Sequence, residues 1–201
     1  MSKPSFEVPL RRLRLEMAWL LAEFSTAASG RPNRNNQLAC EMTVIRLYDA
    51  WARFCRELVI LSSLGDVVTA GGQILTRSHP DLVARSVFTP VYLKLSGRSW
   101  EPRWADATAC IRAAQCLSIQ NLISVTSALG AANSPAENMR RIRNFFAHRG
   151  HSTSTDAMGT TCFLACNKPS VFHLNDYTTG GVRIFESWTD DLLVVATAAI
   201  Q

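Results

Sequence analysis

The sequence predicts an all-α protein, an antiparallel bundle of four or five helices with a short extended or β-like excursion before the last helix. Apolar residues recur at helical spacing in several long segments, and glycine or proline separates these segments from one another. With 201 residues, 47% of them apolar, the chain can fill one core well and is short for two. We therefore expect residues 1–201 to form a single helical domain.

The first predicted helix covers about residues 6–28, where apolar residues follow one another every three or four positions. A second helix is expected from a cap at Asn35 or Asn36 to about Leu64. Helical spacing predicts that its inner stripe consists of Leu38, Met42, Ile45, Tyr48, Ala52, Cys55, Leu58 and Ser62.

Gly65 is expected to end the second helix in the left-handed conformation. From there to Trp100 the chain is rich in glycine and proline, so we expect loops. Within them the pattern predicts a short helix near residues 81–87 and an extended piece at residues 91–95. Helical spacing returns at about residues 102–129 and predicts a single helix that ends at the following glycine.

The segment Ser134-Pro135-Ala136-Glu137 has the pattern of a capping box, with proline at the tolerated first helical position. It predicts a helix over about residues 135–148, with Gly150 as its exit. Residues 160–174 show little helical periodicity, so we expect them to be extended or looped. The last predicted helix covers about residues 182–199, where valine, phenylalanine, tryptophan and leucine share one side.

No apolar run approaches the roughly 20 residues that a membrane-spanning helix needs. The first residues lack an apolar signal core, so we expect a cytoplasmic protein without a membrane partner. The six cysteines include no CxxC pair. Cys162, Cys166 and His173 could in principle bind zinc, but reduced structural thiols are the first interpretation, and we expect no metal and no cofactor.

The charge balance is basic, +5, and 18 of the 21 basic residues are arginines. Planar guanidinium groups suit bidentate contact with phosphate, which points to RNA as a partner. A GC-rich genome also enriches arginine, so composition alone does not separate the two explanations. Two aromatic residues of the second helix, Tyr48 and Trp51, are expected to pack in the core, with base stacking as the alternative.

The strongest functional pattern is Arg143-Asn144-Phe145-Phe146-Ala147-His148, which we call the motif. On an ideal helix Asn144 and His148 share a face, while Arg143 lies about 140° around and roughly 7.5 Å along the axis from His148. Arg141 aligns with His148 better than Arg143 does. We favour Arg143 as the functional arginine because the polar Asn144 follows it and because a fraying last turn lets an arginine reach around.

These residue types predict cleavage of a phosphodiester without a metal. His148 would remove the proton of a ribose 2′-hydroxyl, Arg143 would bind the scissile phosphate, and Asn144 would hold either group by hydrogen bonds. The basic and imidazole side chains around the motif would bind RNA phosphates: Arg140, Arg141, Arg149 and His151. The alternative is a histidine that satisfies the end of a helix beside a solvated basic face.

Residues 139–150 resemble the HEPN superfamily, whose members carry arginine, then a polar residue, and histidine in this arrangement. Residues 44–58 and 185–192 are similar to the aromatic early helix and the closing helix of RiboL-PSP-like HEPN subfamilies. The resemblance implies a metal-independent endoribonuclease, a toxin or antiviral defence effector. It also implies a homodimer with a composite site, in which Phe145, Phe146 and Ala147 serve as core and dimer-contact residues.

The resemblance further implies an antitoxin or a defence-complex partner that keeps the activity in check. A non-catalytic HEPN module that binds RNA or a protein is the second hypothesis. A nucleotide-binding or other small-molecule-binding helical protein, with an accidental motif, is the third. The sequence does not identify the RNA that would be cleaved.

Overall fold

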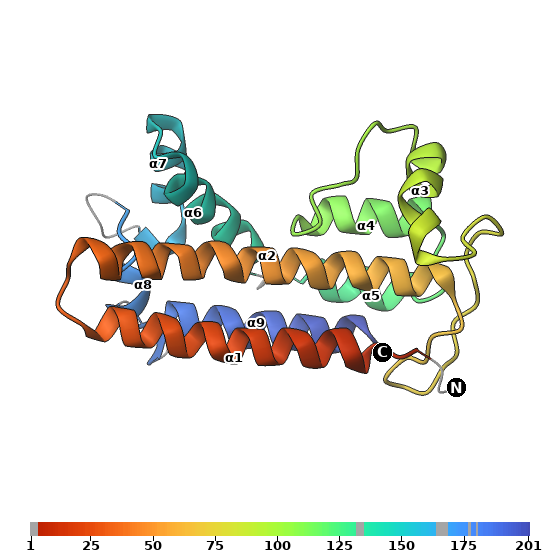
Figure 1. The fold of residues 1–201 in the computed structure, drawn as a ribbon, viewed down its shortest axis with the longest axis horizontal. Coiled ribbons are helices and arrows are strands. Elements are labelled where there is room, and N and C mark those ends of the chain that lie inside the picture. Colours follow the sequence, from red (N-terminus) through yellow and green to blue (C-terminus); the bar gives the residue numbers. More distant parts are fainter. Residues whose placement is uncertain (1–3, 132–134, 164–168, 177, 180) are drawn as a thin grey trace. The chain divides into compact units, whose positions relative to one another are not determined.

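The computed structural model describes residues 4–131, 135–163, 169–176, 178–179 and 181–201. The fold is all-α, as predicted, and the β-like excursion is a short antiparallel pair of strands directly before the last helix (Figure 1). The helices are α1 (Glu7–Ser29), α2 (Arg34–Leu64), α3 (Phe88–Ser96), α4 (Ala107–Cys116), α5 (Leu122–Leu129), α6 (Ala136–His148), α7 (His151–Met158), α8 (His173–Asp176) and α9 (Ile184–Ala199). The remaining elements are the 3-10 turns η1 (Arg85–Val87) and η2 (Thr161–Phe163) and the strands β1 (Thr178–Thr179) and β2 (Val182–Arg183).

The described residues form two compact units. Unit 1 comprises those of residues 1–13, 51–132 and 193–201, and unit 2 comprises those of residues 14–50 and 133–192. The helices α1, α2 and α9 therefore each contribute residues to both units, while α3 to α5 belong to unit 1 and α6 to α8 to unit 2. The expectation of one domain stays a prediction. Among the described residues, no helix combines the length and the apolar character that crossing a membrane requires.

The first half of α2 belongs to unit 2, and its buried stripe differs from the predicted one. Leu38 and Met42 were expected inside but are 44% and 52% exposed, and the residues that pack inward are Cys40, Val44 and Leu47. Both sets have helical spacing, because apolar residues occupy more than one face of α2, so periodicity alone cannot identify the inner face. The helix also starts earlier than expected, since the Asn33 side chain accepts the Asn36 N–H at 2.9 Å.

The core of unit 2 is built around an aromatic pair from α1 and α9. The rings of Phe24 and Phe185 stack with centroids 4.1 Å apart and planes 5° from parallel. Met139 and Ile142 bring α6 into the same buried set. The α6 helix and the shorter α7 follow each other as a hairpin (Figure 1). The motif helix is thus held by apolar packing along one side.

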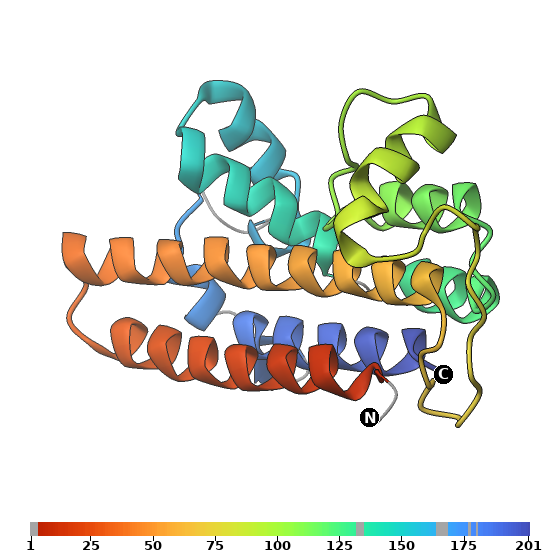
Figure 2. The same ribbon diagram turned by 45° about the vertical axis from the view of Figure 1, so that its right-hand side comes forward.

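In unit 1, Gly65 ends α2 with φ +74°, as predicted. A Cβ at this position would lie 2.3 Å from the backbone nitrogen of Arg77, so the close approach of the following loop also requires glycine. That loop continues to Ala84 and lies beside the end of α2 (Figure 2). Backbone hydrogen bonds such as Asp66 N–H to Leu75 O, 2.8 Å, close it on itself.

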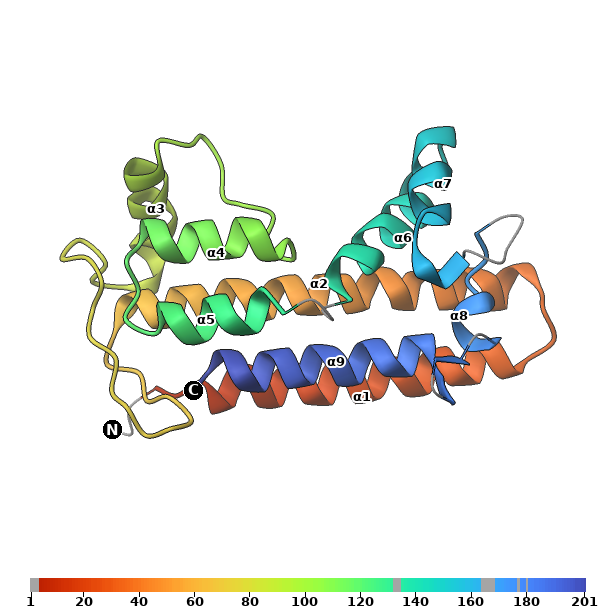
Figure 3. The ribbon, with the colours of Figure 1, turned by 180° about the vertical axis from the view of Figure 1, so that it is seen from behind.

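Two further predictions for unit 1 were wrong. Residues 91–95 are helical, in α3, because Phe88, Val91 and Tyr92 have the spacing that buries one face of a helix. The single helix expected at about residues 102–129 is two helices, α4 and α5 (Figure 3). Asp106 starts α4 by accepting the Ala109 N–H at 3.0 Å, and the left-handed Ser118, φ 51°, separates α4 from α5.

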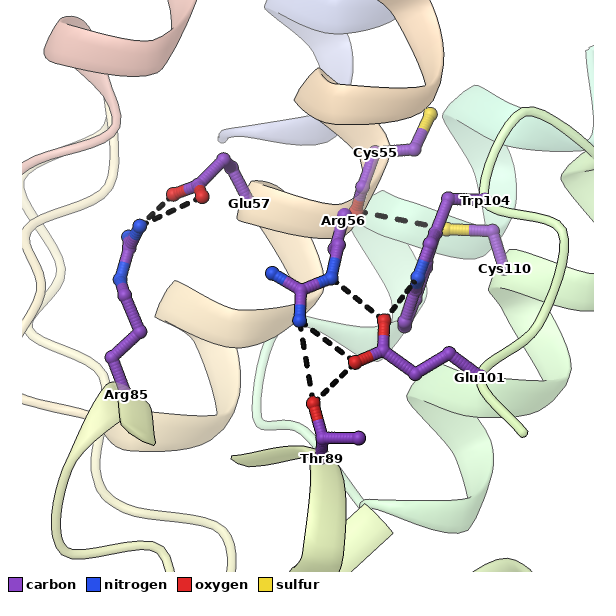
Figure 4. A network of polar contacts seen from close by, with 8 residues as sticks. All are labelled: Cys55, Arg56, Glu57, Arg85, Thr89, Glu101, Trp104 and Cys110. Atoms are coloured by element: carbon purple, nitrogen blue, oxygen red, sulfur yellow. Dashed lines mark hydrogen bonds and ion pairs between the residues drawn. The ribbon is translucent and has the colours of Figure 1, made fainter. Parts of the chain in front are cut away.

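The connection between α3 and α4 is fastened to α2 through Glu101 (Figure 4). The guanidinium of Arg56 donates to both carboxylate oxygens of Glu101 at 2.7 Å, and the Trp104 indole N–H donates to Oε2 at 2.7 Å. The hydroxyl of Thr89 also donates to this carboxylate. The hydrogen bonds from Arg56 lower the pKa of Glu101 to about 2. Partial burial raises this pKa, whereas the hydrogen bonds from Thr89 and Trp104 lower it further.

Replacing Glu101 by glutamine is expected to lower the free energy of unfolding by about 2 kcal/mol, because Arg56, Thr89 and Trp104 lose a shared charged acceptor. Urea unfolding at neutral pH measures this change. Since the folded pKa lies below the unfolded value of 4.5, the stabilisation is present above about pH 4.5 and is lost as the pH falls towards 2. The variant should therefore lack this part of the acid dependence.

Glu57→Gln is the matched control. The Glu57 carboxylate accepts two contacts from Arg85, one of them at 2.7 Å, and the Arg85 side chain is 54% exposed. An exposed ion pair of this kind contributes less than about 1 kcal/mol. Equal losses from the two variants would contradict the structural role given to Glu101.

Candidate functional site

The α6 helix turns one face, which includes Phe146 of the motif, to the core of unit 2, and the other residues of the motif lie on its remaining sides. Its buried residues are Ala136, Met139, Ile142 and Phe146. Within the motif, Arg143, Asn144 and Phe145 are half-buried, while Ala147 and His148 are exposed. The core role expected of Phe146 is therefore confirmed, and the exposed end of α6 carries the histidine.

The end of α6 differs from the prediction that Gly150 is its exit. Arg149 is the left-handed residue, φ 51°, and its N–H donates to Phe145 O at 2.8 Å. Gly150 is extended and begins α7, where its N–H donates to the Thr153 hydroxyl oxygen at 3.0 Å. One helix follows the other with only these two residues between them. His151, interpreted as a loop residue, is exposed but is the first residue of α7.

Two of the arginines expected to bind RNA share one carboxylate. Arg140 donates to Glu137 with Nε and Nη2, both at 2.7 Å, and Arg141 donates with Nε at 2.9 Å. The hydrogen bonds from Arg140 lower the pKa of Glu137 to about 2. Partial burial raises this pKa, and the hydrogen bond from Arg141 lowers it. Glu137 is therefore charged at neutral pH and offsets part of this positive charge. Ser134, the other half of the predicted capping box, lies outside the described residues.

Arg143 has a different environment. Its guanidinium carbon lies 5.7 Å from the ring centroid of Tyr48 on α2, and Nη1 donates to Asn144 Oδ1 at 3.4 Å. The Nε atom is buried and has no hydrogen-bond partner in the part of the chain that is described. No ion pair with a carboxylate holds Arg143 among these residues, in contrast to Arg140 and Arg141. Within the described residues, the guanidinium of Arg143 therefore faces no carboxylate, whereas Arg140 and Arg141 share that of Glu137.

His148 stands at the exposed end of α6, one turn after Asn144 on the same face. No hydrogen bond or ion pair joins His148 to Arg141 or Arg143 in the described residues. Arg141 extends along the helix towards Glu137, and its Nη1 lies 3.8 Å from where a Cβ on Gly159 would stand. Within one chain, the Arg143 side chain therefore donates to Asn144, and the described residues include no hydrogen bond between His148 and either candidate arginine.

A long-range ion pair fixes the corner between α6 and α7. Arg149 Nη2 donates to Oε2 of Glu41 on α2, whose Oε1 accepts from Gln37 Nε2 at 2.7 Å. Glu41 is only 3% exposed. This role of Glu41 was missed in the sequence, because no local pattern near residue 41 indicates a partner 108 positions later. Tyr48 was expected in the core, and its contact with Arg143 is likewise a relation between distant segments.

The described part of the chain contains no cluster of three or more histidine, cysteine or acidic side chains that could hold a metal ion. Cys162 is buried, and burial raises the pKa of its thiol to about 11, as expected for a structural cysteine. Cys40, Cys55 and Cys110 are also buried, whereas Cys116 is exposed. Cys166 lies outside the described residues, so the zinc alternative that included it stays untested.

Comparison with family models, with curated proteins and with solved structures found no match to this chain. Any role given to Arg143, Asn144 or His148 therefore depends on their chemistry and on their surroundings in unit 2. These surroundings consist of an exposed imidazole, a neighbouring amide on the same helix face and a guanidinium without a carboxylate partner.

Proposed function

We propose that this chain is an HEPN-type endoribonuclease that cleaves RNA without a metal, acting as a toxin or an antiviral defence effector under the control of a partner. The observation that carries the proposal is the exposed position of His148 at the end of α6, with Asn144 one turn earlier. An imidazole in this position is accessible to a nucleic acid strand. Arg143, which has no carboxylate partner in the described residues, supplies the matching cation.

The reaction is an internal transesterification. His148 removes the proton of the ribose 2′-hydroxyl, and the 2′-oxygen forms a bond to phosphorus. The bond from phosphorus to the 5′-oxygen breaks, and that oxygen takes a proton from an acid. The guanidinium of Arg143 stabilises the charge that develops on the phosphate oxygens. The products are a 2′,3′-cyclic phosphate and a 5′-hydroxyl.

The separation of Arg143 from His148 supports a site shared by two copies of the chain. On an ideal helix these residues point about 140° apart, which favours a phosphate that is bound by the arginine of one copy and the histidine of another. Two motifs facing each other would place the histidine of each copy near the arginine of the other. The second histidine would then be the acid that protonates the leaving oxygen. A homodimer is accordingly part of the proposal.

The purified protein is expected to cleave single-stranded RNA equally well with and without EDTA and to leave 2′,3′-cyclic phosphate ends. Electrophoresis detects the cleavage, and mass spectrometry of the fragments identifies the ends. Loss of cleavage on chelation, or fragments that end in a 5′-phosphate, would contradict the mechanism. Light scattering at the assay concentration tests the dimer, because an active monomer would contradict the shared site.

A second candidate function is a non-catalytic HEPN module that binds RNA or a protein. It is favoured by the carboxylates that pair with Arg140, Arg141 and Arg149, and by the lack of a hydrogen bond between His148 and an arginine within the described residues. The same assay separates the two functions. RNA that is bound in a salt-dependent way but never cut would support the module, since phosphate contacts weaken as salt rises.

A further inference from the structure

A cleft of about 360 Å³ lies in unit 2 between the first turns of α2 and the end of α6. This volume is within the range of small-molecule sites, about 300–1,000 Å³. The cleft is lined by Arg34, Gln37, Leu38, Glu41, Met42, Ile45, Phe146 and Arg149. The α2 residues follow one another at helical spacing and form one wall, and the motif helix supplies the other wall.

One part of the cleft is apolar and open to solvent. Leu38 and Met42 are 44% and 52% exposed, and Ile45 and Phe146 also line this part of the cleft. Leu38, Met42 and Ile45 belong to the stripe of α2 that spacing assigned to the core. Exposed aliphatic side chains that gather in a cleft beside polar groups mark a binding surface more often than isolated ones do.

The polar part of the cleft is organised by the buried carboxylate of Glu41. Glu41, 3% exposed, accepts from Gln37 and Arg149 and so fixes both side chains at the cleft. Arg149 donates to it through Nη2, which leaves further N–H donors of the guanidinium for a ligand. Arg34 has no carboxylate partner in the part of the chain described. Two cations and one carboxylate give the cleft a net charge of +1, suited to an anion.

We infer that this cleft binds one nucleotide of an RNA strand, with the base against Leu38, Met42 and Ile45 and a phosphate on Arg149. The inference rests on the proposed function and names a subsite for its substrate. A nucleotide combines the two properties that the cleft requires, a flat body with apolar faces and an adjoining anion. Arg149 directly follows His148, so the bound nucleotide neighbours the one whose phosphate is cleaved.

The methyl group of Met42 reports on the cleft. In a protein with ¹³C-labelled methionine methyl groups, assigned through Met42→Leu, the Met42 signal is expected to shift on addition of a mixed-sequence 2′-O-methyl RNA hexanucleotide. This probe lacks the hydroxyl that the reaction needs, so it is bound without being cut. Ribose 5-phosphate, which has the anion but no base, should leave the Met42 signal in place.

Affinity for the same hexanucleotide, followed by fluorescence anisotropy, is expected to fall about fivefold in Leu38→Ala, because apolar contact with the base is lost. Leu15→Ala is the matched control, since Leu15 is 67% exposed on α1, does not line the cleft and should bind RNA like the parent. Leu38 is outside the core, so its replacement should not disturb the fold, which circular dichroism checks.

The possible results separate this inference from the proposed function. If the hexanucleotide shifts the ring signals of His148 but leaves Met42 unmoved, the cleft is not a nucleotide site while the nuclease proposal stands. An equal response of Met42 to ribose 5-phosphate would make the cleft an anion site and overturn the inference. If Met42 responds to RNA but the protein never cleaves it, the cleft stands and the nuclease proposal fails. If the protein binds no RNA at all, both fail.

Discussion

His148→Ala is expected to abolish RNA cleavage and to leave the fold and RNA binding intact. General acid–base catalysis by a positioned side chain contributes about 10²–10⁴-fold to a rate, and the proposed reaction has the imidazole of His148 as its base. His148 is exposed and makes no hydrogen bond or ion pair with the described residues, so alanine removes none of these interactions. A substitution of this kind changes stability by roughly 0.5 kcal/mol or less.

The matched control is His151→Ala, because His151 is an exposed histidine only three residues away, at the start of α7. It is expected to retain most of the cleavage activity and to bind RNA slightly less well. The measurement is the single-turnover cleavage rate of a labelled RNA, together with the melting temperature of each variant. A His148→Ala protein as active as its parent would remove the catalytic role of the motif.

The second large effect is expected from Arg143→Ala, with a loss of about 10²–10³-fold in the cleavage rate. Removing one group that stabilises developing negative charge has an effect of this size. Arg141→Ala should cost less than about tenfold, because Arg141 donates to Glu137 and lies beside Gly159. Arg143 has no carboxylate partner in the described residues, and Tyr48 supports its guanidinium.

The comparison of these two arginine variants settles which arginine acts with His148. An inactive Arg141→Ala protein beside an active Arg143→Ala protein would transfer the role to Arg141. Mixing inactive His148→Ala and inactive Arg143→Ala proteins provides a further test of the shared site. In a dimer that exchanges subunits, the mixed pair keeps one His148 beside one Arg143 but lacks the second histidine, so water must protonate the leaving oxygen and only a small part of the activity should return. Activity of the mixture above that of either variant alone would show that His148 and Arg143 act from different copies.

The long helices were predictable because their patterns are local and extend over many turns. The spacing of apolar residues placed α1, α2, α6 and α9 within a few residues of their observed bounds. The inner face of α2 was not predictable, since Leu38 and Cys40 both belong to stripes of helical spacing and only packing against other segments decides between them. The short helix α3 was mistaken for an extended segment for another reason, because an apolar run as short as residues 91–95 does not separate helix from strand by its spacing.

In the candidate site, too, the contacts between residues close in sequence could be predicted and those between distant residues could not. The neighbouring residues Arg143 and Asn144 were assigned together from the sequence, and their side chains are in contact. The contacts of Arg149 with Glu41 and of Arg143 with Tyr48 join α6 to α2, and no local pattern encodes them. The pairing of Glu137 with Arg140 and Arg141 follows helical spacing and could have been expected. The distance between interacting residues along the chain thus decides what sequence reasoning can find.

The corner at Arg149 has a further consequence for how the chain can vary. Because only Arg149 and Gly150 lie between α6 and α7, a residue inserted or deleted there would change the relative orientation of the two helices. A change of length would rotate α7 relative to α6 and would pull Arg149 away from the carboxylate of Glu41. Arg149, the residue after His148, is tied to an acid near the start of α2, so that a change of length at this corner would require a matching change in a distant stretch of the polypeptide.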